Sequence, residues 1–135
     1  MIKKFIIVIP ARYNSSRFPG KPLIKILGIP MLIRTYQQCL KVVSRDKIFI
    51  ATDDKRIQKL CDDNNMSCVM TSKKCLTGTD RIAELSKKIK ASFYINIQGD
   101  EPICDTGDIK KLIKTAKKYP NRIINGYTKI TDKKL

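Results

Sequence analysis

Apolar residues along this chain form short runs that alternate with longer segments of mixed character. The runs at 5–9, 47–52, 67–70 and 93–97 are rich in β-branched or aromatic residues and are bounded by polar ones, which predicts strands. The first run is apolar at every position, as expected of a strand that is covered on both faces. A further short strand is predicted to begin at 123–124.

The segments between these runs repeat apolar residues every three or four positions, which is the spacing of one helix face. Helices are therefore predicted over 31–43, from Asp53 or Asp54 to the turn at 64–65, over 77–88 and over 109–118. Either aspartate can cap the second helix. The third begins with Thr-Gly-Thr-Asp at 77–80, which matches a capping box.

Strands and helices alternate four times along the chain, and this order predicts the fold class. Parallel strands need crossover connections, and right-handed crossovers place helices on both sides of the sheet. We expect an open α/β sandwich that forms a single domain over 1–135, without repeats or an internal linker.

The composition is that of a soluble globular protein, with 42% hydrophobic and 30% charged residues in 135. The first ten residues superficially resemble a signal peptide. Their apolar core is short, however, and runs into Arg12 and Arg17 rather than a cleavage site. No apolar run reaches the roughly 18 residues that span a bilayer. We therefore expect a buried strand and no membrane insertion.

Cysteine and histidine usage limits the chemistry. There are five cysteines without any Cys-x-x-Cys pair, and histidine is absent, which excludes the common zinc patterns and histidine acid–base catalysis. Free thiols in a domain without disulfides suit a reducing compartment, so a cytoplasmic location is expected.

The chain carries 28 basic and 12 acidic residues, a net charge of +16, which would suit a polyanionic partner. Many of the lysines, however, occupy solvent positions of predicted helices, as between 110 and 118. The nine Phe and Tyr residues are scattered rather than arranged for base stacking. A solvated helix face is the favoured interpretation, and nucleic acid is not an expected partner.

Two loops follow predicted strands at their carboxyl ends, where open α/β sheets bind ligands. The first contains Arg12, Arg17 and Lys21, and the second contains Asp100 and Glu101. If the two strands are neighbours, these cations and carboxylates share one rim, which suits a magnesium-bound nucleotide. The first loop matches no known phosphate loop. Its composition alone leaves phosphate binding and an ordinary exposed turn equally open.

Four blocks occur in an order that resembles one known family. They are Ile-Pro-Ala-Arg-Tyr-Asn-Ser-Ser-Arg-Phe-Pro-Gly-Lys-Pro-Leu at 9–23, Ala-Thr-Asp-Asp at 51–54, Thr-Gly-Thr-Asp-Arg at 77–81 and Gln-Gly-Asp-Glu-Pro at 98–102. Together they resemble 3-deoxy-manno-octulosonate cytidylyltransferase, or CMP-Kdo synthetase.

The resemblance implies a Rossmann-like nucleotidyltransferase, a three-layer sandwich that joins CTP to the sugar acid Kdo and releases pyrophosphate. The product, CMP-Kdo, would serve lipopolysaccharide or capsule assembly. Nucleotidyl transfer needs positioning and charge neutralisation, so neither a histidine nor a covalent nucleophile is required. The resemblance also implies a homodimer for full-length members.

Individual roles follow from the same resemblance. Arg12 and Lys21 would hold the triphosphate, with Arg17 a weaker candidate, and Asp100 would bind Mg2+. The catalytic set is thus Arg12, Lys21 and Asp100. The implied substrate-binding set is Pro10, Ala11, Arg12, Arg17, Lys21, Thr77, Gly78, Thr79, Arg81 and Gln98. Without the resemblance, these residues would be interpreted as surface cations, a turn, strand-end residues and a capped helix start with an exposed arginine.

Two departures from the family keep alternatives open. Members usually carry a histidine shortly before the third block, where this chain has Lys73, Lys74, Cys75 and Leu76. Members also continue for another half, which supplies sugar-acid contacts and a second acidic metal ligand. A catalytically incomplete nucleotide-binding fragment is therefore one alternative. A cytidylyltransferase for another acidic sugar is a second, although those families have a different opening loop, Arg-x-Gly-Ser-Lys.

Overall fold

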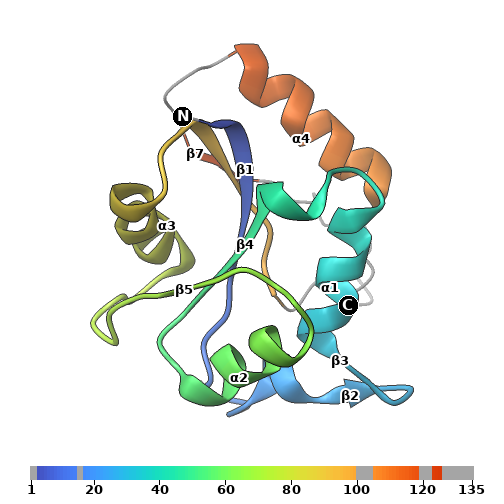
Figure 1. The fold of residues 1–135 in the computed structure, drawn as a ribbon, viewed down its shortest axis with the longest axis vertical. Helices are drawn as coiled ribbons and strands as arrows, with labels where there is room; N and C mark the ends of the chain where they lie inside the picture. Colours follow the sequence, from blue (N-terminus) through green and yellow to red (C-terminus); the bar gives the residue numbers. More distant parts are fainter. Residues whose placement is uncertain (1–2, 15–16, 100–104, 119–122, 126–135) are drawn as a thin grey trace, which may run out of the picture.

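The computed structural model describes residues 3–14, 17–99, 105–118 and 123–125. Its main sheet has five strands in the order β5-β4-β1-β6-β7, and every neighbouring pair is parallel. The strands are β1 (Lys3–Pro10), β4 (Ile48–Thr52), β5 (Cys68–Met70), β6 (Ala91–Asn96) and β7 (Ile123–Asn125). The predicted parallel sheet is confirmed, and β1 lies at its centre (Figure 1).

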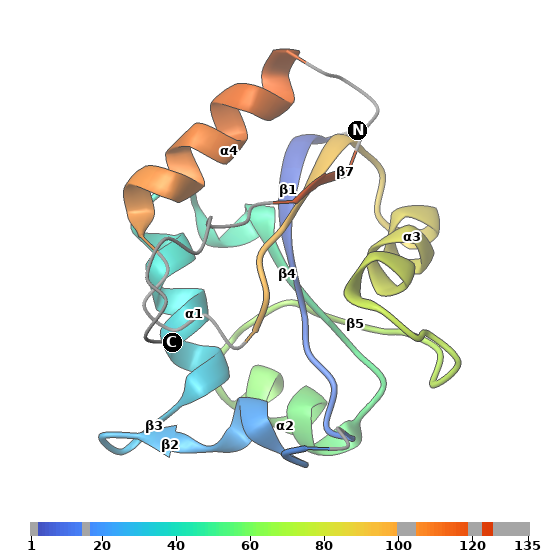
Figure 2. The ribbon, with the colours of Figure 1, turned by 180° about the vertical axis from the view of Figure 1, so that it is seen from behind.

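Helices cover both faces of this sheet. They are α1 (Met31–Leu40), α2 (Lys55–Asp63), α3 (Gly78–Lys88) and α4 (Thr106–Lys118). Figures 1 and 2 show α1 and α4 on one side of the sheet and α3 on the other. The predicted α/β three-layer sandwich is therefore confirmed.

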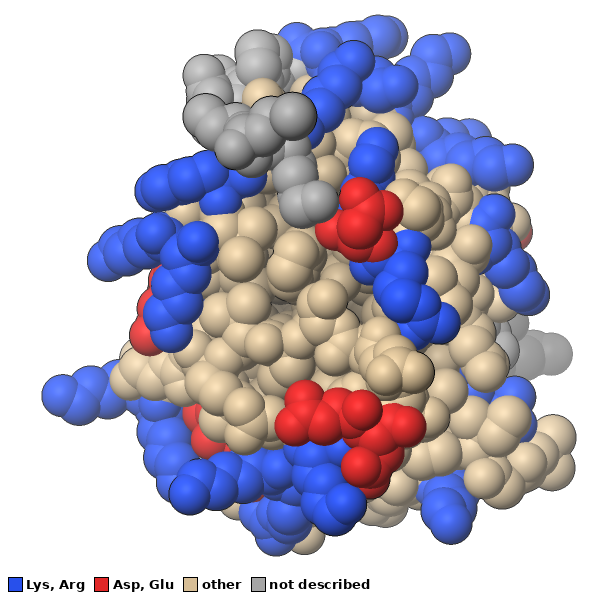
Figure 3. Space-filling model, in the orientation of Figure 1, with Lys and Arg blue, Asp and Glu red and all other residues tan. Residues whose placement is uncertain are grey.

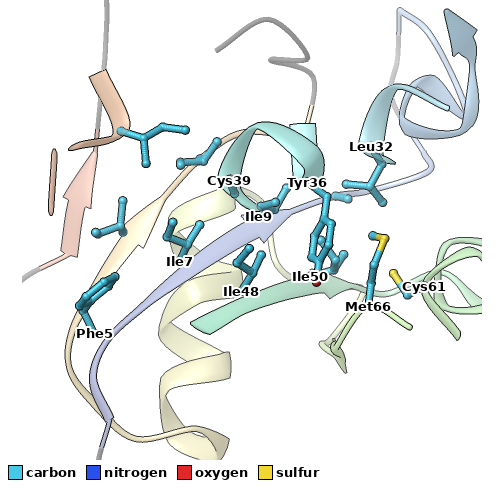
Figure 4. Packing of buried hydrophobic residues seen from close by; sticks show 14 of the residues in the cluster. Phe5, Ile7, Ile9, Leu32, Tyr36, Cys39, Ile48, Ile50, Cys61 and Met66 are labelled. Atoms are coloured by element: carbon cyan, nitrogen blue, oxygen red, sulfur yellow. The ribbon is translucent and has the colours of Figure 1, made fainter. Parts of the chain in front are cut away.

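The side chains of β1 explain why its sequence is apolar throughout. Phe5, Ile7 and Ile9 point into the core that the sheet shares with α1, α2 and α4 (Figure 4). Ile6 and Val8 point into the smaller core under α3. Because alternate residues of a strand face opposite sides, a central strand under two helical layers needs apolar residues at every position. Each fully buried Ile or Val contributes about 1.5–3 kcal/mol.

Several boundaries differ from those predicted. The helix predicted over 31–43 ends at Leu40, because the Lys41 and Val42 amides close a tight turn on the carbonyls of Gln38 and Cys39. The strand predicted over 47–52 begins at Ile48, after a 3-10 turn at Arg45–Lys47. α4 begins at Thr106, three residues before the predicted start.

The structure also contains a small hairpin that the apolar pattern does not predict. β2 (Lys25–Ile26) pairs antiparallel with β3 (Ile29–Pro30). Leu27 and Gly28 form its turn with φ angles of 51° and 84°. Leucine rarely adopts positive φ, so Leu27 gives no turn signal in the sequence. Among the described residues, no helix has the length and apolar character needed to cross a membrane.

Candidate functional site

A pocket of about 120 Å³ opens where β1 and β6 end and α3 begins. Its lining comprises Pro10, Ala11, Arg12, Cys75, Leu76, Thr77, Gly78, Arg81 and Gln98. β1 and β6 are direct neighbours, which was the condition for the two predicted loops to meet. The pocket thus brings together residues from three of the four sequence blocks, at the carboxyl edge of the sheet where such folds bind ligands.

The end of β1 is hydrogen-bonded to both of its neighbours, β4 and β6. The Ala11 amide donates to the Ala51 carbonyl at 2.8 Å, and the Ile97 amide donates to the Val8 carbonyl at 3.0 Å. A Cβ at Gly99 would lie only 3.3 Å from the Pro10 carbonyl oxygen. The Gly99 carbonyl accepts a hydrogen bond from the Thr35 hydroxyl at 3.2 Å. The chain after β6 therefore passes directly beside the opening loop.

The opening loop is closed by its own backbone. The Gly20 amide donates to the Tyr13 carbonyl at 2.7 Å, and Gly20 has a φ of 74°. A Cβ at Gly20 would lie 2.9 Å from the Tyr13 ring, so glycine is required here for both reasons. The Arg56 guanidinium packs 3.2 Å from the centroid of the Tyr13 ring. The loop is thereby anchored to the start of α2.

The start of α3 forms the opposite wall, and the predicted capping box is confirmed. The Thr77 hydroxyl accepts from the Asp80 amide at 3.1 Å, while the Asp80 carboxylate accepts from the Thr77 amide at 3.2 Å. The cap uses the Thr77 hydroxyl, so the helix-start amides of Gly78 and Thr79 are the groups left for an anionic or carbonyl ligand.

Gly78 allows α3 to approach β1 closely. A Cβ at this position would lie 3.0 Å from Pro10 Cγ and 3.2 Å from Gln98 Nε2. Both distances are shorter than ordinary contacts, so a larger residue would push the helix start away from the strand ends. The glycine in this block therefore has a packing role in addition to any contact with a ligand.

Arg81 is buried rather than exposed, with 3% of its surface accessible. Its guanidinium donates to the Thr71 hydroxyl at 2.8 Å and pairs with the Asp53 carboxylate at 3.2 Å. The interpretation of Arg81 as an exposed arginine beside a capped helix start is thus wrong. Arg81 lines the pocket, but its position is determined by a pair that joins the second and third sequence blocks.

Of the two aspartates predicted as alternative caps, Asp54 caps α2. Its carboxylate accepts from the amides of Arg56 at 2.8 Å and Ile57 at 3.3 Å. The side-chain hydrogen bond from Arg56 lowers the pKa of Asp54. Asp53 instead pairs with Arg81, 28 residues away, and no local sequence pattern could have indicated that contact.

Cys75 lies in the pocket wall, just before the start of α3. Its thiol contacts the Glu84 carboxylate at 3.2 Å, and the same carboxylate accepts from the Ser72 amide at 2.8 Å. Burial, followed by the hydrogen bond to Glu84, raises the pKa of Cys75. The contact with Glu84 ties this segment of the pocket wall to α3. The sequence interpretation assigned the thiol no role.

Three predicted residues lie outside the pocket lining, namely Arg17, Lys21 and Thr79. Asp100 and Glu101 fall outside the described residues. Within the described part of the chain, no group of three or more His, Cys, Asp or Glu side chains is arranged to hold a metal ion.

Arg12 differs from the other charged residue in the pocket. It is exposed, and its guanidinium makes no ion pair with any carboxylate in the described residues. Arg81, in contrast, is already paired with Asp53. Arg12 is therefore the cation of this pocket whose charge is left for a ligand.

The basic side chains on one face of the molecule are dispersed. On the face shown in Figure 3, Lys and Arg project mostly around the periphery, and acidic side chains occupy part of the centre. This distribution agrees with solvated helix faces and does not form one continuous cationic groove on that face.

Comparison with known proteins relates this chain to one family of proteins. A 3-deoxy-manno-octulosonate cytidylyltransferase of Escherichia coli is 40% identical over 119 residues, covering 88% of this chain and 48% of that protein. The mitochondrial protein of the same name from Arabidopsis thaliana is 40% identical over 120 residues, covering 87% of this chain and 41% of that protein. The chain thus spans about half the length of the curated relatives it matches.

Solved structures agree. A structure of CMP:2-keto-3-deoxy-manno-octonic acid synthetase complexed with CTP aligns with a TM-score of 0.81 at 40% identity, covering 87% of this chain and 48% of that one. A cytidylyltransferase from Leptospira borgpetersenii aligns with a TM-score of 0.73 at 20% identity, covering 84% of this chain and 48% of that one, which shows a shared fold. The family model described as cytidylyltransferase matches residues 6–134, and the chain therefore belongs to the cytidylyltransferase family.

Proposed function

We propose that this chain forms the CTP-binding part of a 3-deoxy-manno-octulosonate cytidylyltransferase, which converts CTP and Kdo to CMP-Kdo and pyrophosphate. The observation that carries the proposal is the pocket in which the unpaired cation Arg12 meets the start of α3 and Gln98. The similarity to a synthetase complexed with CTP supports the choice of nucleotide. Kdo as the acceptor rests on the names of the relatives.

The pocket offers the two kinds of group that a nucleoside triphosphate requires. Arg12 supplies positive charge for phosphate oxygens, and we assign the same role to Lys21 and, more weakly, to Arg17. The amides at the start of α3 supply donors for the cytosine carbonyl. In the reaction, an oxygen of the sugar acid attacks the α-phosphorus, a new P–O bond forms, and the bond to pyrophosphate breaks. The protein's part is to align these groups and neutralise charge.

We assign Mg2+ binding to Asp100, although the described residues do not include it. What supports this assignment is the place of Gly99, the residue before it in the sequence, which packs against Pro10 and Ala11 of the opening loop. A single carboxylate oxygen is a suitable ligand, because Mg2+ commonly uses one or two carboxylates together with substrate phosphates. The ion would shield phosphate charge. Gln98 at the pocket edge would then contact the nucleotide or the sugar acid.

The experiment measures pyrophosphate release from CTP by the 135-residue chain, with and without Kdo and Mg2+. We expect release only when both are present. The Arg12→Gln variant should raise the KM for CTP at least tenfold, while Lys25→Gln, which removes an exposed charge in β2, should not. Full activity with another sugar acid and none with Kdo would refute the proposed acceptor and favour a cytidylyltransferase for that other acidic sugar.

The incomplete fragment is the second candidate, because the chain spans about half the length of its relatives. Titration of the 135-residue chain with CTP, followed by NMR, separates the two. Turnover of CTP and Kdo by this chain would reject the fragment hypothesis. CTP binding without turnover would support it and would leave the nucleotide assignment intact.

Location and assembly are also proposals. Among the described residues, Cys39, Cys61, Cys68 and Cys75 form no disulfide, which supports a reducing cytoplasm. A homodimer and a role in lipopolysaccharide or capsule synthesis follow from the family resemblance alone and stay predictions.

A further inference from the structure

A second cavity lies at the other end of β1 from the nucleotide pocket. It has a volume of about 400 Å³ and is lined by Phe5, Val42, Val43, Ser44, Lys47, Lys110, Ile113 and Lys117. These residues come from the start of β1, the turn after α1, the approach to β4 and one face of α4. Five residues of extended strand separate Phe5 from Pro10, or roughly 16 Å, so the two cavities are distinct sites.

The floor of this cavity is apolar and well ordered by packing. The Phe5 ring is 6% exposed and stacks on Phe93 with centroids 5.5 Å apart. Val43 and Ile113 are half-buried and pack against the main core. Phe5 is thus almost fully covered, and the half-buried Val43 and Ile113 are the part of the floor where the apolar body of a ligand can replace water.

The rim is cationic. Lys47 places its ammonium group 4.4 Å from the centroid of the Phe5 ring, directly over the floor. Lys110 and Lys117 are two helical turns apart on α4, with Ile113 between them on the same face. No acidic residue lines the cavity. None of these three ammonium groups makes an ion pair with a carboxylate among the described residues.

We propose that this cavity binds an amphipathic organic anion, with a carboxylate or phosphate group at the lysine rim and an apolar body over Val43 and Ile113. An inorganic anion would leave the floor hydrated, and a neutral apolar molecule would place no negative charge opposite the three lysines. The volume lies within the usual range of small-molecule sites, about 300–1,000 Å³. The proposal does not depend on the nucleotide site.

Decanoate is a suitable probe, because it combines one carboxylate with an alkyl chain. Titration of the 135-residue chain below the micelle threshold, followed by amide NMR, should give saturable shifts at Phe5, Val43 and Ile113. Decanol and acetate, which each lack one half of the proposed ligand, should bind at least tenfold more weakly. Saturable shifts confined to residues of the nucleotide pocket, or equal affinity for decanol, would overturn the proposal.

Paired lysine variants test the rim. The double variant Lys110→Gln/Lys117→Gln should raise the Kd for decanoate at least fivefold. The matched variant Lys111→Gln/Lys114→Gln removes the same charge from exposed positions of α4 outside the cavity, and it should change the Kd less than twofold. Equal weakening by both variants would mean attraction to net charge alone and would reject a defined site. The NMR spectrum of each variant reports directly on whether it is folded.

Discussion

Removing the Asp53 carboxylate should destabilise the fold more than removing an exposed carboxylate, because Asp53 neutralises a buried cation. The side chains of Arg81 and Asp53 are 4% and 17% exposed, and their nearest nitrogen and oxygen lie 3.2 Å apart. Breaking a fully buried pair by removing one partner costs about 3–5 kcal/mol. Arg81 keeps the Thr71 hydroxyl at 2.8 Å, and Asp53 is partly solvated. We therefore expect Asp53→Asn to lower the free energy of unfolding by about 2 kcal/mol.

The assay is urea unfolding followed by circular dichroism. The unfolding midpoints of variant and wild type are compared, with the slope of the unfolding free energy against urea concentration unchanged. Asp63→Asn is the matched control, since the Lys59–Asp63 pair is just as close, at 3.0 Å, but 77% and 59% exposed. That variant should cost less than about 0.5 kcal/mol. With Arg81→Met added, the double-mutant cycle should show a coupling of about 1 kcal/mol or more. Equal effects of the two asparagine variants, or an additive cycle, would refute the buried-pair reasoning.

Three further predictions concern the same region of the fold. Thr77→Ala should cost about 1 kcal/mol in urea unfolding because it removes the cap of α3, and Thr77→Ser should restore most of it. Asp54→Ala should cost about 1 kcal/mol at neutral pH. The folded-state pKa of Asp54 is lowered, so the stability that its carboxylate contributes is complete above about pH 4 and is lost as the pH falls through the folded-state pKa. A difference in unfolding free energy between variant and wild type that persists at lower pH would contradict this. Gly78→Ala should weaken CTP binding roughly tenfold, because the added methyl group forces α3 away from Pro10 at a strain of about 1–3 kcal/mol. Gly107→Ala, in α4, should leave CTP binding unchanged. Titration of each variant with CTP measures both effects.

The layers of the fold were predictable because the responsible patterns are local. An apolar residue at every position of 5–9 indicates a strand between two layers, and helical spacing indicates which face of each helix is buried. The order of the strands was not predictable from these patterns. The pairing of β1 with both β4 and β6 depends on contacts between residues far apart in sequence.

The same division applies to the site. The capping box at Thr77 was found because its two partners are three residues apart. The pairing of Asp53 with Arg81 was missed because it crosses from the end of β4 to α3. The contact between Cys75 and Glu84 was missed for a similar reason, since a thiol nine residues before a glutamate has no recognised pattern.

The structure also changes how the sequence blocks should be interpreted. Gly20, Gly78 and Gly99 permit neighbouring atoms to approach the backbone closely, and Arg81 neutralises Asp53. A variant of any of these residues can lose activity because the wall of the pocket is displaced, so such a loss does not identify a residue that touches substrate. Arg12 has no comparable structural partner among the described residues, and its removal should therefore weaken CTP binding without lowering the free energy of unfolding. Measured together, these two quantities separate residues that build the pocket from residues that bind the ligand.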